Sequence, residues 1–234
     1  MASILDSIRT VYTDNYALVK LGLFGYLFFL IFEMSGMDVT KQPLNMINIS
    51  FLIIIIILYA GFSSIIINNR INQRLDTLPS LNPVTWLNVI TKSALVIFPY
   101  LIIGFPVINF LVGLFNFDGV PQQVAIAIIQ LILVAIVITA LIFFSRNYKV
   151  KEGFDFAKIT TGFPDVLVYC LLAIIFLLIY NVFVAVPLLY IIYSFFDVGP
   201  IFRYIVFFLI TMNVAFLADY CGQLSFDIDN KSVY

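Results

Sequence analysis

Six long apolar segments, separated by short polar connections, occupy most of the chain. A helix needs about 20 apolar residues to cross a hydrocarbon core about 30 Å thick. A strand in the same place would leave its backbone polar groups without partners in lipid, so the segments favour helices. We predict transmembrane helices over residues 21–34, 46–67, 93–115, 122–144, 165–195 and 200–221. The predicted fold is therefore an all-α polytopic membrane bundle of six transmembrane helices, with residues 1–234 forming a single integral membrane domain.

Short segments with helical spacing precede the first, third and fifth predicted spans. Their apolar positions are Ile4, Leu5, Ile8, Val11 and Tyr12, then Val84, Leu87 and Ile90, and finally Phe156, Ile159 and Phe163. An apolar face opposite a polar one is typical of a helix that lies in the membrane interface, and we predict three interfacial amphipathic helices. The recurring order predicts three helical-hairpin repeats, 1–78, 79–150 and 151–234. Any series of in-out hairpins would also show some of this order.

Individual residues refine the limits of the spans. Lys20 is expected to snorkel to the interface, which extends the first span back toward Tyr16. Pro121, Pro164 and Pro200 are expected at or near helix starts, where a missing N–H costs nothing. Three acidic residues near span ends are expected to be solvated at the interface; they are Glu33, Asp165 and Asp219.

Basic residues concentrate in every second connection. Ten of the twelve fall on one predicted side: Arg9, Lys20, Arg70, Arg74, Lys92, Arg146, Lys149, Lys151, Lys158 and Lys231. The positive-inside rule places this side in the cytoplasm, so we predict a multi-pass protein of the cell membrane with cytoplasmic N- and C-termini. Five of the ten are candidate contacts for anionic lipid headgroups, namely Arg70, Arg74, Arg146, Lys149 and Lys151.

A few polar or helix-breaking residues occur inside the spans. Pro99, Gly104 and Pro106 share the third span, which is expected to be kinked or locally unwound because proline removes an intrahelical hydrogen bond. Pro187 predicts a bend in the long fifth span. The intramembrane amides are Asn109, Gln130, Asn181 and Asn213. Such residues either hydrogen-bond between helices or form a polar lining for a small substrate, and both interpretations remain open.

Composition argues against a catalytic or nucleic-acid-binding role. Charged residues make up 11% of the chain, against about 25% in a soluble domain. The chain contains no histidine, and Cys170 and Cys221 form no metal-ligand motif and are expected to be unpaired thiols. No phosphate-binding glycine motif is present. We predict a protein that is not an enzyme, uses no cofactor and binds no nucleic acid.

The middle of the chain resembles a prokaryotic membrane family called domain of unknown function 4013. The residues that carry the resemblance are Gly61-Phe62, Asn69-Arg70-Ile71-Asn72, Leu78-Pro79, Lys92, Phe98-Pro99-Tyr100 and Gly153-Phe154-Asp155-Phe156-Ala157-Lys158-Ile159. The resemblance covers roughly residues 51–190. It implies a multi-span integral membrane protein from a bacterium or archaeon, without an established activity and without catalytic residues.

Two functions fit these observations. The first is a membrane subunit or partner-binding component of a transport or envelope complex, because the central spans carry no ionisable site. The alternative is a permease for a small apolar or zwitterionic molecule, with the broken third span and the amides as its pathway. The sequence names neither a partner nor a substrate.

Overall fold

In the computed structural model, every regular element within the described residues (3–35, 46–115, 120–195 and 199–231) is a helix. The elements are α1 (Ile4–Thr13), α2 (Ala17–Met34), α3 (Met46–Ile71), α4 (Pro83–Phe115), α5 (Val120–Asn147), η1 (Val150–Phe154), α6 (Phe156–Tyr180), η2 (Asn181–Ala185), α7 (Val186–Phe195) and α8 (Pro200–Lys231). Within this described part of the chain, six helical segments are long and apolar enough to cross a membrane. The all-α fold is therefore confirmed, and the protein is a multi-pass integral membrane protein.

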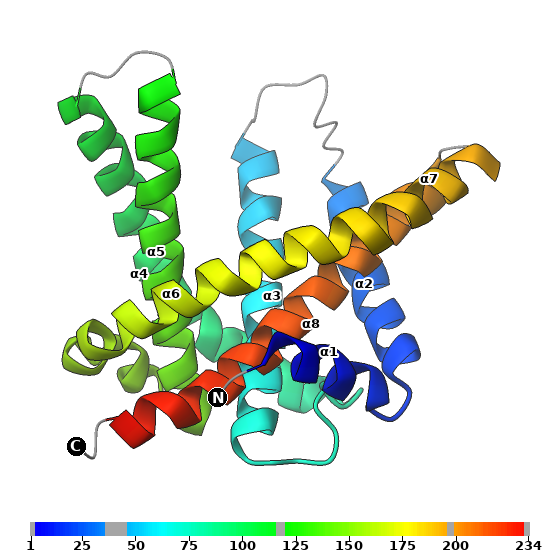
Figure 1. The fold of residues 1–234 in the computed structure, drawn as a ribbon, viewed down its shortest axis with the longest axis horizontal. Helices are drawn as coiled ribbons and strands as arrows, with labels where there is room; N and C mark the ends of the chain where they lie inside the picture. The colour runs from blue at the N-terminus through cyan, green and yellow to red at the C-terminus, as the bar shows by residue number, and fades with distance from the viewer. Residues whose placement is uncertain (1–2, 36–45, 116–119, 196–198, 232–234) are drawn as a thin grey trace.

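The core of the bundle lies where α8 crosses α2 and α3 (Figure 1). Buried aromatic rings fill this crossing, including Phe24, Phe28, Phe62 and Phe216. Small residues allow the helix backbones to approach closely, as is usual between membrane helices. A Cβ atom added at Gly25 would lie 2.9 Å from the Cα atom of Phe208 on α8. The close contact of α2 with α8 therefore depends on glycine at this position.

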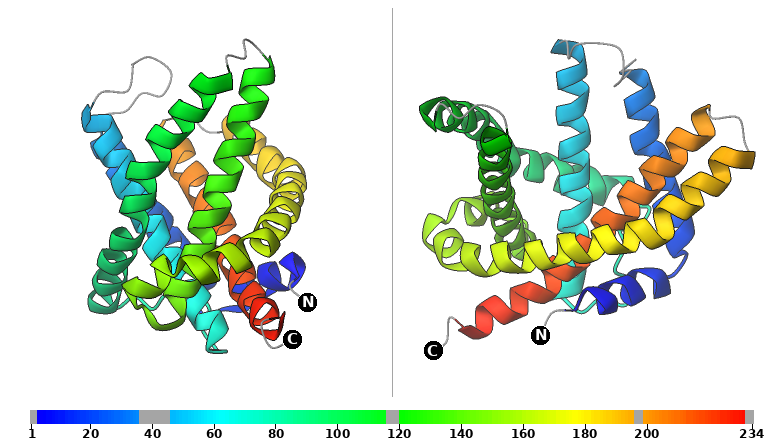
Figure 2. Two further views of the ribbon diagram at one scale, coloured as in Figure 1. Left: turned by 90° about the vertical axis from the view of Figure 1, so that its left-hand side faces the viewer. Right: turned by 45° about the horizontal axis from the view of Figure 1, so that its top comes forward.

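Helices α4 and α5 form a second group with η1 and the beginning of α6 (Figure 2). Its buried side chains include Val96 and Ile97 from α4, Phe143 and Phe144 from α5, and Ile159 from α6. Both α4 and α5 also pack against α3. Helix α3 thus joins the two groups of helices.

A single long helical segment, α6–η2–α7, runs obliquely across the outside of the bundle (Figure 1). The candidate span Phe156–Ser194 has 39 residues, or about 58 Å at 1.5 Å per residue. This is about twice the hydrocarbon thickness, so the segment must be strongly tilted or partly interfacial. Within it, η2 is a turn of π-helix in which the Val186 N–H donates to the Asn181 carbonyl. Pro187 follows directly and lacks the N–H that regular α-helical bonding would use.

The structure differs from the sequence predictions at the amphipathic segments. The first is a separate helix, α1, but its buried face packs against α8. The second and third are the opening turns of α4 and α6, which continue into the spans without a break. Pro164 accordingly lies inside α6 rather than at its start, because a helix tolerates one missing donor. The chain does turn at Tyr16, whose φ of 58° is left-handed.

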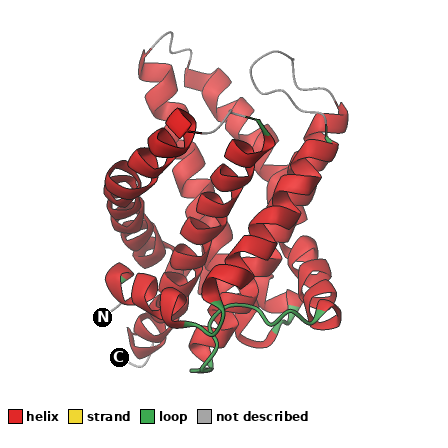
Figure 3. Cartoon of the chain, turned by 90° about the vertical axis from the view of Figure 1, so that its right-hand side faces the viewer, coloured by secondary structure: helices red, strands yellow, loops and turns green. Residues whose placement is uncertain are grey.

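One end of the bundle carries α1 and the connection between α3 and α4 (residues 72–82) (Figure 3), and η1 follows the end of α5. Arg70, Arg74 and Arg146 lie at this end, which we call the basic side. Helix α8 extends past the predicted limit of residue 221 to Lys231 at this side. The predicted threefold repeat remains a prediction.

Candidate functional site

Two of the predicted intramembrane amides meet between α8 and the π-helical turn. The Asn181 Nδ2 atom donates to Asn213 Oδ1 at 3.1 Å, and the Asn213 Nδ2 atom donates to Asn181 Oδ1 at 3.0 Å. Each amide also donates to the carbonyl four residues earlier in its own helix, Leu177 and Leu209 respectively. Both amides therefore use all their donors within the protein, and the pair joins the long helical segment to α8.

The remaining predicted lining residues lie on other helices. Gln130 is exposed on α5, and Pro187 is exposed on α7. The helix runs through Pro99 and Pro106 without interruption, so the local unwinding predicted for the third span does not occur. A Cβ atom at Gly104 would lie 2.6 Å from Leu133 Cδ2, which places this glycine at the α4–α5 contact. The side chain of Asn109 lies outside the described residues.

An ion cluster that the sequence did not predict connects α1, α3 and α8 on the basic side. The Arg70 Nη2 atom lies 2.7 Å from Asp6 Oδ2, and Arg70 Nε lies 3.7 Å from Asp219 Oδ1. Gln223 Nε2 donates to Asp219 Oδ2 at 3.0 Å and to Ser7 Oγ at 2.8 Å. Asp219 is completely buried, so the expected solvation at the interface is wrong. Arg70 binds these internal carboxylates.

A second buried ion pair holds the corner between α1 and α2. Lys20 Nζ lies 2.6 Å from Asp14 Oδ1, and both side chains are buried. The other carboxylate oxygen of Asp14 accepts a hydrogen bond from the Leu78 backbone N–H at 2.7 Å. The expected snorkelling of Lys20 is therefore wrong, because a nearby carboxylate provides its counter-charge inside the protein. Asp14 also fixes the connection that leads from α3 to α4.

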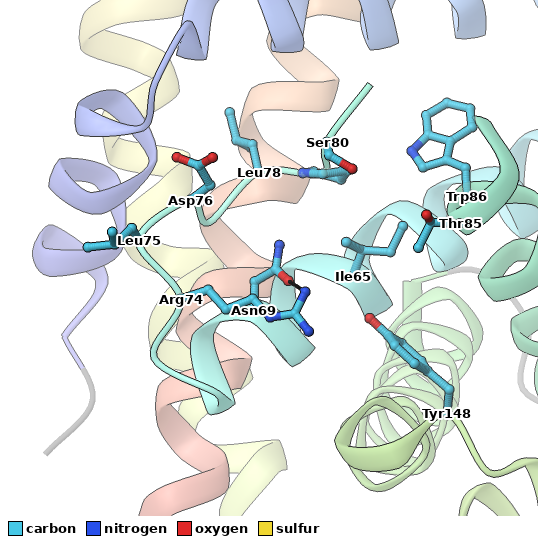
Figure 4. A pocket seen from close by; sticks show the side chains of 11 residues that line it. Ile65, Asn69, Arg74, Leu75, Asp76, Leu78, Ser80, Thr85, Trp86 and Tyr148 are labelled. Atoms are coloured by element: carbon cyan, nitrogen blue, oxygen red, sulfur yellow. Dashed lines mark hydrogen bonds between the residues drawn. The ribbon is translucent and has the colours of Figure 1, made fainter. Parts of the chain in front are cut away.

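This connection covers a cavity of about 440 Å³ on the basic side (Figure 4). The cavity lies between the end of α3, residues 74–80, the first turn of α4 and the residue that follows α5. Its apolar lining consists of Ile65, Leu75, Leu78 and Pro79, and its polar lining consists of Asn69, Arg74, Asp76, Ser80, Thr85, Trp86 and Tyr148. The cavity therefore combines an apolar wall with several groups that can hydrogen-bond.

Some polar groups of the cavity hydrogen-bond within the protein, and another has no partner among the described residues. Arg74 Nη1 donates to Asn69 Oδ1 at 3.2 Å, and Asp76 Oδ1 accepts from the Asn15 side chain at 3.1 Å. The buried Nε1 atom of Trp86 has no hydrogen-bond partner among the described residues. Burial raises the pKa of the Tyr148 phenol to about 12, opposed by the nearby Arg74 guanidinium, so this hydroxyl stays protonated at neutral pH.

The other predicted headgroup contacts do not gather at this cavity. The Arg146 guanidinium lies over the Phe143 ring, 4.7 Å from its centroid. Lys149 precedes η1 and Lys151 lies within it, and both side chains are exposed. Of the five predicted contacts, Arg74 is the one that lines the cavity.

Comparison with known proteins adds no assignment. The chain matches no family model, and neither the curated proteins nor the solved structures contain a significant match.

Sequence reasoning missed the ion cluster and most of the cavity. Asp219 offered one signal, since it is a carboxylate within a long apolar segment with Gln223 one helical turn later. Trp86 offered another, as the single tryptophan of the chain at the start of a span. Their partners come from helices far apart in the sequence and could not be inferred from spacing.

Proposed function

We propose that the chain is a membrane subunit that binds another integral membrane protein along the outer face of α6–η2–α7. The observation that carries this proposal is how little of that segment its own chain covers. In an 18-residue apolar stretch of Phe156–Ser194, 22% of the residues are buried. The corresponding stretches of α2 and α3 each have 39% of their residues buried. Ile175, Ile179 and Val182 lie on the exposed side of the segment.

The distribution of polar groups supports this proposal over a pathway through the protein. The Asn181–Asn213 pair satisfies its own donors, and the Tyr59 hydroxyl lies 3.1 Å from Thr211 Oγ1. The sequence has no charged residue between Asp165 and Asp197. A long uncharged helix on the perimeter is suited to packing against a partner helix by van der Waals contact.

Site-specific photo-crosslinking in native membranes tests this proposal. A benzophenone amino acid is placed at Ile175, Ile179 or Val182, and at the matched exposed positions Leu23 on α2 and Ile128 on α5. We expect adducts with a different polypeptide from the first three positions and none from the two controls. Equal adducts from all five positions would contradict the proposal, as would adducts formed exclusively with a second copy of the chain.

A second candidate function, a permease for a small apolar or zwitterionic molecule, is favoured by the π-helical turn at Asn181. Such turns are often found at functional sites, and Pro187 lies two residues after the end of this one. Replacing Asn181 and Asn213 together with leucine should then abolish uptake or export in membrane vesicles. Unchanged flux would leave the amide pair with a structural role.

We further propose that the chain is a member of the family called domain of unknown function 4013, which the motifs at Asn69-Arg70-Ile71-Asn72 and Phe98-Pro99-Tyr100 support. We also propose that the basic side faces the cytoplasm. The distribution of Lys and Arg residues supports the orientation. Single cysteines at the exposed residues Lys151 and Ser194, in a background without Cys170 and Cys221, test it in intact cells. A membrane-impermeant maleimide should label residue 194 and not residue 151; the reverse pattern would invert the orientation.

A further inference from the structure

We propose that the cavity between Arg74, Trp86 and Tyr148 binds the phosphate group of a phospholipid headgroup, and that Asp76 favours headgroups that also carry an ammonium group. This site is separate from the outer face of α6–η2–α7, so it does not depend on the proposed partner.

The cavity presents several hydrogen-bond donors, from Arg74, Trp86 and Tyr148. The buried Trp86 indole N–H has no acceptor among the described residues, and a buried donor without a partner is destabilising. The Tyr148 hydroxyl and the Arg74 guanidinium turn toward the same space (Figure 4). Arg74 uses one nitrogen on Asn69 and keeps other donors. A phosphate group, with several acceptor oxygens and negative charge, matches this set.

The charges of the lining are balanced, and this argues for a headgroup with two opposite charges. Arg74 and Asp76 contribute one charge each and form no ion pair with one another in the described structure. The remaining Asp76 oxygen can accept a hydrogen bond from an ammonium group, as in an ethanolamine headgroup. The quaternary ammonium of choline has no N–H to donate, and a glycerol headgroup has no positive charge.

The position of the cavity fits a lipid more closely than a free ion. It lies at the basic side, where Trp86 occupies the first turn of α4, and tryptophan is favoured at the headgroup level. Trp86 also lines a second, mostly apolar cavity of about 140 Å³ with Leu23, Phe24, Leu27 and Pro83. An amphiphile bound at Trp86 thus finds apolar surface next to the polar groups that hold its phosphate.

Trp86 is the single tryptophan of the chain, so its fluorescence reports directly on this site. The purified protein in a neutral detergent is titrated with short-chain phosphatidylethanolamine, phosphatidylglycerol and phosphatidylcholine, and with inorganic phosphate. We expect a saturable change with phosphatidylethanolamine at the lowest concentration. The Arg74→Gln variant should raise the half-saturation concentration at least tenfold, and Asp76→Asn should shift the preference toward phosphatidylglycerol.

Lys92→Gln is the matched control, because Lys92 is a basic residue of α4 that does not line the cavity. Its titration should equal that of the wild type. Arg74 is exposed, so its replacement should not disturb folding, and circular dichroism verifies the helix content. A second variant, Thr85→Val, removes one lining hydroxyl and should weaken binding less than Arg74→Gln.

Three results would overturn the proposal. The first is the absence of a saturable change with any of the lipids. The second is the same half-saturation concentration in wild type and Arg74→Gln, which would mean that the apolar part alone binds. The third is saturation by inorganic phosphate at concentrations as low as those of the lipids, which would assign the site to a free anion.

Discussion

Loss of the Arg70 guanidinium is expected to destabilise the protein mainly through the more distant of its two carboxylate partners. Asp6 is close, at 2.7 Å, but its side chain is 52% exposed. Asp219 is farther, at 3.7 Å, but its side chain is 0% exposed. An exposed ion pair contributes about 0–1 kcal/mol because water screens it and side-chain entropy opposes it. A buried charge that loses its partner costs about 3–5 kcal/mol.

The Arg70→Gln variant should therefore lower the free energy of unfolding by about 3 kcal/mol, since Asp219 retains the Gln223 amide but no nearby cation. Adding Asp219→Asn to this variant removes the buried charge and should restore most of the loss. Asp6→Asn is the matched control, because it removes the shorter ion pair and should cost less than about 1 kcal/mol.

Thermal unfolding in detergent, followed by circular dichroism, measures these differences. A change of 1 kcal/mol shifts Tm by about 2–4 °C in a chain of this length, so Arg70→Gln should unfold about 6–12 °C below the wild type. Two results would refute the reasoning. One is a double variant no more stable than Arg70→Gln, and the other is an Asp6→Asn variant as unstable as Arg70→Gln.

Three further predictions concern the bundle. Asn181→Ala and Asn213→Ala should each lower the free energy of unfolding by about 1 kcal/mol, and the double variant should lose little more than either alone, because the pair is reciprocal; additive losses would contradict this. Gly25→Ala should destabilise the α2–α8 contact by about 1–3 kcal/mol, measured as a fall in Tm. Gly199→Ala is its control and should be neutral, because the added Cβ meets no atom within 4 Å in the described structure beyond the glycine and its chain neighbours. The pKa of Tyr148 is raised from 10.0 to about 12 in the folded protein. The stability that this protonated phenol contributes is therefore complete below pH 10 and is lost as the pH rises toward 12. Tyr148→Phe should therefore reduce the fall of Tm between pH 10 and 12. If Tm of the variant fell as much as that of the wild type, other titrating groups would cause the fall.

Some residues of the candidate sites could be identified from the sequence, but their partners in the fold could not. The amides Asn181 and Asn213 were identifiable, because a polar side chain in an apolar span requires a partner, but the sequence did not show that they pair with each other. Arg74 was identifiable as a basic residue at the interface. Its neighbours Trp86 and Tyr148 follow the start of α4 and the end of α5, and no local pattern relates those two positions.

The sequence by itself determined the helical fold class, the number of spans and the side on which most basic residues lie. The physical reason is that hydrocarbon leaves a backbone no partners outside its own segment, so each long apolar run must be helical. The tertiary structure decided where the charges near the span ends lie. Lys20 and Asp219 are suited to an interface by position alone, yet both are buried because Asp14 and Arg70 lie within reach. Whether these charged side chains are buried or exposed depends on contacts between α1, α2, α3 and α8. These contacts form where the helices cross, and hydrophobic periodicity along the sequence does not encode them.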